Sequence, residues 1–344
     1  MENKEYVIGA DIGGTTVKLG LFEEDGALLE KWEIPTVIEG DGTAVLRDIA
    51  AEIQKCREKH NIPADGILGV GAGIPGPVTA DGVVHRCVNL GWGVFDVRTA
   101  LEETVGLPVV VVNDANAAAM GEAWKGGGRG SENVVFITLG TGVGGAVISD
   151  GHMVAGANGA AGEFGHMTIN PAETETCACG RRGCVQQYVS ASGIARLARK
   201  YLAEHEEESA LRSVEKLTTK DVFDAAKNGD GAANAILENV YDAFGYTISA
   251  VCTVADPEVV VIGGGVSKAG EMLVEGVKKG FLKYVFYPNT DVGSTWPCSA
   301  TTPAFTAAAS CFWTALRDKN GKDREKWIIP KRSCLNRCRS RRRS

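Results

Sequence analysis

The sequence predicts an α/β protein of two domains. The chain has 344 residues, of which 44% are hydrophobic and 23% are charged, and this is enough for two ordinary cores. Residues 6–22 and 134–148 both read as a strand, a glycine-rich turn and a second strand, which suggests two related halves. Residues 107–124 read as a β-branched run followed by an Ala-rich helix, and such a run is typical of a strand buried on both faces.

Composition limits the classes of partner. No run of about 18 apolar residues occurs, so no membrane span is predicted. The first 14 residues lack the apolar core of a signal peptide, which favours the cytoplasm, where the ten cysteines are expected to be reduced or metal-bound. Residues 314–344 hold 12 Lys and Arg against 3 Asp and Glu, while the rest of the chain has a net charge of −16. An acidic body argues against nucleic acid as the main ligand.

Residues 6–22 carry a turn with anion-binding chemistry. Adjacent glycines let the backbone bend tightly and approach a ligand closely, and successive backbone N–H groups in such a turn bind anions. The alternative is a plain β-hairpin. A Walker P-loop is excluded because its G-x-x-x-x-G-K-[ST] pattern is absent. The candidate phosphate-binding residues are Gly13, Gly14, Thr15, Thr16 and Lys18.

Hydrophobic periodicity places the helices and a further strand. Residues 67–78 predict a buried strand that ends in a Pro/Gly-rich turn. Thr218 or Thr219 is the expected N-cap of a short helix. Longer helices are predicted at residues 43–60, 192–209 and 231–257.

The strand of residues 107–112 leads into Asn113 and Asp114. In open α/β sheets, ligands bind beyond the carboxyl ends of the strands. A carboxylate at that place can accept the proton of a substrate hydroxyl. The alternative is that Asp114 only caps the following helix. Because glycine loops of the phosphate-binding type occur in the same chain, we predict that Asp114 is catalytic.

Two more glycine turns resemble the anion-binding turn of residues 6–22. The first lies within residues 134–148, and the second follows the strand of residues 257–262. Either turn alone is a weak signal, and the second could be an ordinary strand-to-helix turn. The candidate nucleotide-binding residues are Thr138, Gly140, Thr141, Gly142, Gly144, Gly263, Gly264 and Gly265.

Residues 156–190 hold the densest group of metal-binding side chains. Zinc prefers four sulfur or nitrogen ligands in a tetrahedron, and a site with no open position is structural. Gly180 and Gly183 supply the tight turns that a short ligand loop needs. The alternative is a set of buried, reduced thiols. The predicted zinc ligands are His166, Cys177, Cys179 and Cys184, and Glu163 and His166 beside them are candidates for binding the hydroxyls of a sugar.

This segment resembles the signature of the ROK family (repressors, open reading frames and sugar kinases). The family pattern runs C-x-C-G-x-x-G-C, then an apolar residue, a Glu, and a Ser four residues on. Here the pattern spans residues 177–186, with Ser190 in place, and the resemblance covers roughly residues 5–292. Gln186 stands where the family has a sugar-binding Glu, and its amide forms hydrogen bonds without carrying a charge.

The resemblance implies an actin-like (hexokinase, ribonuclease-H-like) fold with two domains around a cleft, expected at residues 1–115 and 116–292. It implies phosphorylation of a hexose, glucose first, at the 6-hydroxyl, with ATP and Mg²⁺, giving glucose 6-phosphate and ADP. Asp11 would lie near the magnesium, Asp114 would accept the hydroxyl proton, and the third glycine turn would close over the adenosine. The implied sugar-binding residues are Asn89, Asn113, Asp114, Glu163, His166 and Gln186. For Asn89 a turn-forming role before Gly91 is an equal alternative. A homodimer is also implied.

The family pattern stops after about residue 292. Back-translation of residues 295–312 with a shift of two nucleotides permits L-A-L-L-G-N-D-A-G-I-Y-G, which is similar to the family's C-terminal segment. We therefore hypothesise that residues 293–344 are a frameshifted tail and that their Arg-rich end has no selected role. A basic nucleic-acid arm is the alternative.

Two rival interpretations of the whole chain remain. One is a ROK kinase for another sugar, such as N-acetylmannosamine, fructose, allose or N-acetylglucosamine. The other is a sugar-sensing regulator of the same family. Regulators carry a helix-turn-helix of some 80 residues before the first glycine loop, and here that loop begins at Asp11.

Overall fold

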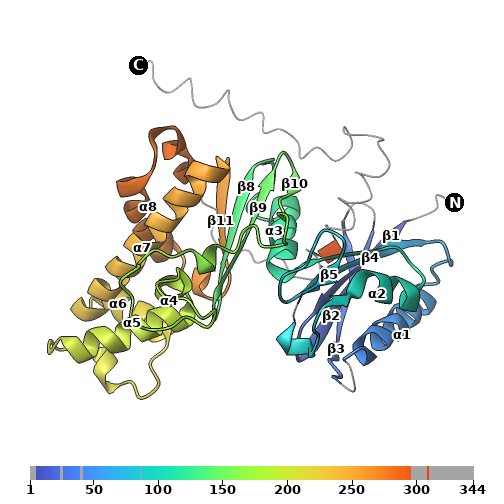
Figure 1. The fold of residues 1–344 in the computed structure, drawn as a ribbon, viewed down its shortest axis with the longest axis horizontal. Helices are drawn as coiled ribbons and strands as arrows, with labels where there is room; N and C mark the ends of the chain where they lie inside the picture. The colour runs from blue at the N-terminus through green and yellow to red at the C-terminus, as the bar shows by residue number, and fades with distance from the viewer. Residues whose placement is uncertain (1–4, 24–25, 39–41, 86, 296–307, 310–344) are drawn as a thin grey trace. The chain divides into compact units, whose positions relative to one another are not determined.

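The computed structural model describes residues 5–23, 26–38, 42–85, 87–295 and 308–309, and Figure 1 shows the path of the chain. The chain divides into two compact units, which separate between Glu132 and Asn133. We expected the division after residue 115, whereas helix α3 (Asp114–Lys125) belongs to the first unit. The predicted frameshifted tail lies outside the described residues apart from 293–295 and 308–309.

A five-stranded sheet with the order β3-β2-β1-β4-β7 forms the centre of the first unit. β1 pairs antiparallel with β2 and parallel with β4, β4 pairs parallel with β7, and β3 is an edge strand antiparallel to β2. The strands are β1 (Tyr6–Ile12), β2 (Thr16–Glu23), β3 (Leu28–Pro35), β4 (Ile67–Ile74) and β7 (Val109–Asn113). A separate small sheet pairs β5 (Val83–Val84) with β6 (Phe95–Asp96).

Helix α1 (Ala44–Lys59) confirms the amphipathic helix predicted at residues 43–60. Its buried residues recur at helical spacing and belong to the same apolar core as the inward-facing residues of β1 and β2. Helix α2 (Val97–Val105) begins at Asp96, whose carboxylate accepts a hydrogen bond from the backbone N–H of Thr99. In a separate small cluster, Ala309 packs with Val7 and Phe22.

A four-stranded sheet with the order β10-β9-β8-β11 forms the centre of the second unit. β8 (Val134–Leu139) pairs antiparallel with β9 (Val143–Ser149) and parallel with β11 (Val259–Gly263), and β10 (His152–Met153) extends β9. Each unit thus has an antiparallel meander of three strands with a parallel strand beside the first of them. This repetition confirms the prediction of two related α/β halves.

The helices of the second unit lie together on one side of its sheet, as Figure 1 shows for the yellow and orange segments. Thr218, not Thr219, is the N-cap of α6, and it forms a reciprocal capping box with Asp221. The helices are α4 (Gln186–Val189), α5 (Ala191–Glu204), α6 (Thr219–Lys227), α7 (Gly231–Ala255) and α8 (Glu271–Tyr284). The 3-10 turns of the chain are η1 (Val88–Leu90), η2 (Phe164–His166), η3 (Ala210–Ser213), η4 (Val266–Ala269) and η5 (Tyr287–Thr295).

Among the described residues, no helix has the length and apolar character needed to cross a membrane. The six cysteines in that part of the chain are all free thiols, namely Cys56, Cys87, Cys177, Cys179, Cys184 and Cys252.

Candidate active site

Two carboxylates meet at the carboxyl edge of the sheet in the first unit. Asp11 lies near the end of β1, and Asp114 follows the end of β7. The strand between them, β4, contributes Gly73, which pairs with Asp11, and a Cβ added to Gly73 would lie 3.9 Å from the Cα of Asp114. The parallel register therefore brings together two acidic residues that are 103 positions apart. Gly73 is a site residue that our sequence analysis missed, because one glycine in a strand gives no distinct signal.

Asn113, not Asp114, is the N-cap of α3. The Oδ1 of Asn113 accepts hydrogen bonds from the backbone N–H groups of Ala115 and Asn116, at 2.9 and 3.1 Å. Its Nδ2 donates to the carbonyl of Gly76 at 3.0 Å. The capping explanation for Asp114 is therefore not needed, since the cap position is already filled.

The electrostatic environment shifts both carboxyl groups in the same direction. Desolvation raises the pKa of Asp114, and hydrogen bonds from the backbone of Ala115 and Asp114 and from Asn113 offset part of this. Asp114 is nonetheless open to solvent on one side. Desolvation also raises the pKa of Asp11, Lys18 lowers it, and the charge of Asp114 raises it further. A proton or a cation is thus favoured at this edge of the sheet.

The first glycine turn lies beside the same edge. The backbone N–H of Gly13 donates to the carbonyl of Thr16 at 3.0 Å, and the hydroxyl of Thr36 donates to the carbonyl of Gly13 at 2.6 Å. Thr36, which sequence analysis missed, anchors the turn from the end of β3. A Cβ on Gly14 would come within 2.9 Å of Asn89, so Asn89 packs directly against the turn. Thr15 and Lys18 are exposed.

The second and third glycine turns are neighbours in the second unit. Gly263 pairs with Thr138 across β8 and β11, and Gly264 has φ +86°. A Cβ there would lie 2.5 Å from the carbonyl oxygen of Leu139, so only glycine fits. Gly140 accepts a hydrogen bond from the backbone of Ala191 at the start of α5, which ties the second turn to that helix. Of the remaining candidates, Thr141, Gly142 and Gly144 lie in or directly after the second turn, and Gly265 directly precedes η4.

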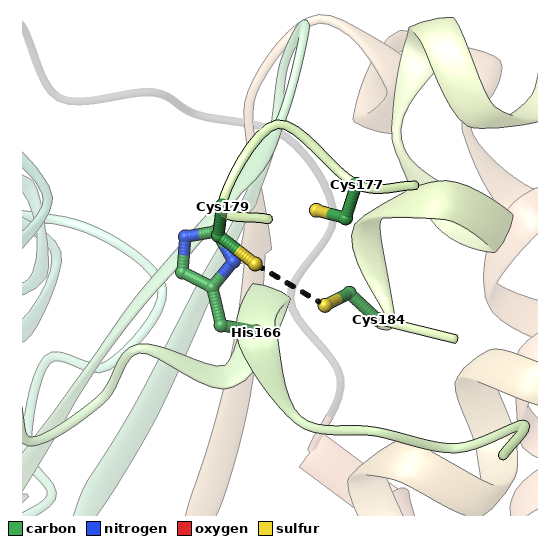
Figure 2. A group of neighbouring side chains, drawn as sticks. All are labelled: His166, Cys177, Cys179 and Cys184. Atoms are coloured by element: carbon green, nitrogen blue, oxygen red, sulfur yellow. Dashed lines mark hydrogen bonds between the residues drawn. The ribbon is translucent and has the colours of Figure 1, made fainter. Parts of the chain in front are cut away.

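The four predicted zinc ligands do come together. One ligand atom from each of His166, Cys177, Cys179 and Cys184 lies within 4.8 Å of all the others, as Figure 2 shows. The sulfurs of Cys179 and Cys184 are 3.6 Å apart. Gly180 and Gly183 have φ +84° and +71°, which confirms that they form the tight turns of this loop.

This donor set fits a zinc ion. Three thiols and one imidazole are soft or borderline ligands in the number that a closed tetrahedral site requires. The Nδ1 of His166 is buried and has no hydrogen-bond partner among the described residues, which is costly unless a ligand occupies it. Hydrogen bonds from the backbone and side chain of Arg181 lower the pKa of Cys179 to about 6, so that thiol readily becomes a thiolate.

Gln186 links the cysteine loop to the second glycine turn. Its Nε2 donates to the sulfur of Cys177 at 2.9 Å. Its Oε1 would lie 3.0 Å from a Cβ on Gly142. The amide of Gln186 donates to this sulfur, which an ionised glutamate could not do, so the glutamine makes a contact that a glutamate would lose. Glu163 lies at the start of η2, one turn before His166.

A buried ion-pair network supports the loop, and our sequence analysis missed it. The carboxylate of Glu173 accepts hydrogen bonds from the hydroxyl of Tyr188 at 2.8 Å and from the guanidinium of Arg196 at 3.0 Å. Burial alone would raise the pKa of Glu173, but the bonds from Tyr188, the backbone of Glu175 and Arg196 outweigh it and lower the pKa to about 2. Sequence offered only isolated charges on a loop and a helix.

The predicted sugar-binding residues divide between the two units. Asn89, Asn113 and Asp114 lie in the first unit. Glu163, His166 and Gln186 lie in the second. Their joint role in binding a sugar stays a prediction.

Comparisons with known proteins identify the family of this chain. The sequence profile of the ROK family matches residues 7–296. A glucokinase of Halalkalibacterium halodurans is 41% identical over 288 residues, which is 83% of this chain and 87% of the relative. A glucokinase of Thermotoga maritima is 36% identical over 82% of this chain and 89% of the relative. The crystal structure of a ROK family glucokinase from Streptomyces griseus in complex with glucose and AMPPNP has a TM-score of 0.67 and 31% identity, covering 88% of this chain and 98% of that one.

We predict that the second unit loses stability at low pH because Glu173 becomes protonated. Its pKa of about 2 lies below the ordinary 4.5, so its contribution is fully present above about pH 4.5 and is lost as the pH falls toward 2. Glu173→Gln should lower the free energy of unfolding at pH 7 by about 3 kcal/mol. In this variant the free energy of unfolding should also decrease less between pH 4.5 and pH 2 than in the wild type. Denaturant titrations across this range measure both effects.

Glu175→Gln is the matched control, because Glu175 also pairs with Arg196, at 2.7 Å, but its side chain is 52% exposed. A screened pair of this kind contributes about 1 kcal/mol or less. Equal losses in the two variants would contradict a special role for Glu173.

Proposed function

The chain belongs to the ROK family, and from this we propose that it transfers the γ-phosphoryl group of ATP to the 6-hydroxyl of glucose, yielding glucose 6-phosphate and ADP. One observation carries the proposal. The carboxylate of Asp114 stands at the carboxyl end of β7 beside Asp11, and Asn113 relieves it of the capping role.

Asp114 acts as the general base. Its carboxylate accepts the proton of the 6-hydroxyl as the bond from that oxygen to the γ-phosphorus forms and the bond from the γ-phosphorus to the bridging oxygen of ADP breaks. The raised pKa of Asp114 makes the carboxylate a better proton acceptor, provided the pH is high enough to keep it ionised. Phosphoryl transfer otherwise depends mainly on positioning and on charge stabilisation.

The glycine turns hold the nucleotide. Backbone N–H groups around Gly13, Gly140 and Gly264 bind phosphate oxygens and the adenosine end, since turns of this type present several donors to an anion. Asp11 is the residue that would hold Mg²⁺, which neutralises charge on the phosphates when bound. Burial and the charge of Asp114 raise the pKa of Asp11, and a bound cation would lower it again.

The sugar is held by Asn89, Asn113, Glu163, His166 and Gln186. The cysteine loop binds zinc and fixes the ring of His166 and the amide of Gln186, because a metal orients its ligand and that ligand's neighbours. A homodimer and a cytoplasmic location complete the proposal.

Asp114→Asn should reduce kcat by about 10²- to 10⁴-fold with little change in KM, because the amide keeps the shape but cannot take a proton. Glucose-dependent release of ADP from ATP–Mg²⁺ measures this. Asp65→Asn, an exposed aspartate of the same unit, is the control and should retain full activity. An Asp114→Asn variant with more than half of the wild-type rate would refute the assignment. A sugar panel run alongside decides the substrate, since a higher kcat/KM for another hexose would replace glucose.

Gln186→Glu tests the departure from the family signature. A charged acceptor forms a stronger hydrogen bond to a hydroxyl than an amide oxygen does, by about 1 kcal/mol. We therefore expect a KM for glucose about fivefold lower, with kcat nearly unchanged. Gln54→Glu, which adds the same charge on the exposed side of α1, should leave KM unchanged. An unaltered KM in Gln186→Glu would show that this side chain does not touch the sugar.

Cys179→Ser should remove one zinc ion per chain, because it deletes one of four ligands in a site that needs all of them. Elemental analysis of the dialysed protein gives the stoichiometry, and the KM for glucose should rise as His166 loses its anchor. Cys252→Ser, in α7, is the control for loss of a buried thiol and should keep its zinc. If Cys179→Ser retains wild-type zinc, the loop is not a zinc site.

A further inference from the structure

A second group of metal-binding side chains lies in the first unit, on elements that the proposed reaction does not use. Glu30 is on the edge strand β3, Cys56 is in the last turn of α1, and His60 is the C-cap residue of that helix. One ligand atom from each lies within 4.8 Å of the other two. Nothing in the ROK-type signature or the glycine turns includes these residues.

The helix and the strand supply the geometry. Cys56 and His60 are separated by four positions, so they project from the same face of α1. The Nε2 of His60 lies 2.6 Å from one carboxylate oxygen of Glu30. The other oxygen of Glu30 faces the ammonium group of Lys59. The helix therefore presents a thiol and an imidazole to the carboxylate of the neighbouring strand.

Burial separates this cluster from an ordinary surface ion pair. Cys56 is 5% exposed, and the side chains of Glu30 and His60 are 23% and 29% exposed. An ion held there would have protein on the thiol side and water on the other. Three protein ligands with water in the fourth position are a common zinc arrangement.

We propose that Glu30, Cys56 and His60 bind a divalent cation of the zinc class, which clips the edge strand β3 to the end of α1. A thiolate with an imidazole selects zinc or cobalt over magnesium and calcium, which prefer oxygen ligands only. On binding, the metal–sulfur bond forms as the S–H bond of Cys56 breaks, and the proton leaves to solvent. His60 binds as the neutral imidazole.

Lys59 opposes the ion and is the chief competitor for Glu30. Its side chain is 64% exposed, so the ammonium group can turn into solvent when the cation takes the carboxylate. Glu52, one turn earlier on α1, pairs with Lys55 at 2.6 Å and does not reach the cluster. The clip would restrain β3, which is an edge strand of its sheet in the part of the chain that the structure describes.

The test uses the full chain, stripped with a chelator and dialysed against zinc, with bound metal counted by elemental analysis. We expect His60→Gln and Cys56→Ser each to bind one zinc ion fewer per chain than the wild type. Cys252→Ser and His205→Gln, which remove a buried thiol and an imidazole elsewhere, should bind the wild-type number. Cobalt titration followed by visible absorption should show a one-thiolate site that is lost with Cys56.

His60 is partly exposed at a helix end, so its variant keeps the test decisive even if Cys56→Ser misfolds. Lys59→Gln removes a competing charge and should tighten cobalt binding about fivefold. Amide exchange in β3 should slow on zinc addition in the wild type and not in His60→Gln. Equal zinc content in the wild type and His60→Gln would overturn the proposal. Because none of these residues belongs to the kinase site, this result is independent of whether the chain phosphorylates glucose.

Discussion

Parallel pairing of β1, β4 and β7 is the constraint on which the candidate active site depends. Each strand ends at the same edge of the sheet, so Asp11 and Asp114 meet there although they are far apart in sequence. The middle strand carries Gly73 at that edge, where an added Cβ would make only ordinary contacts, at 3.4 to 3.9 Å. Burial at this edge raises the pKa of both carboxyl groups, and the charge of Asp114 raises that of Asp11 further.

The cysteine loop depends on other contacts, since it is an irregular segment that must hold a fixed shape. Its turns rely on glycines in the left-handed region, and its ends are fixed by the buried pair of Glu173 and Arg196. Gln186 and the bond from Ala191 to Gly140 then join the loop and the start of α5 to the second glycine turn. A metal bound in the loop would therefore help to fix the second glycine turn, through a short chain of hydrogen bonds within one unit.

The two metal-type clusters found among the described residues differ in how they are built. The cysteine loop gathers its ligands within 19 residues, so short-range turns suffice to assemble it. Glu30, Cys56 and His60 come from a strand and a helix that meet only when the first unit is folded. A metal in the cysteine loop would order that loop. A metal at the other cluster would instead stabilise packing between β3 and α1 that is already formed. Both kinds couple metal binding to folding free energy.

The sequence by itself determined what is local. The strand–turn–strand repeats, the amphipathic helix at α1, the long helix at α7 and the four ligands of the cysteine loop were all predicted, because periodicity, glycine turns and ligand spacing act over a few residues. Whether Asp114 is catalytic or only caps the following helix was left open, and the backbone path gives the cap position to Asn113. Tertiary structure alone placed Gly73 between two aspartates, Thr36 against the first turn, and Glu30 beside Cys56 and His60. These contacts join strands, a helix and loops that are distant in sequence. Their register is set by packing of the whole unit, which no local pattern contains.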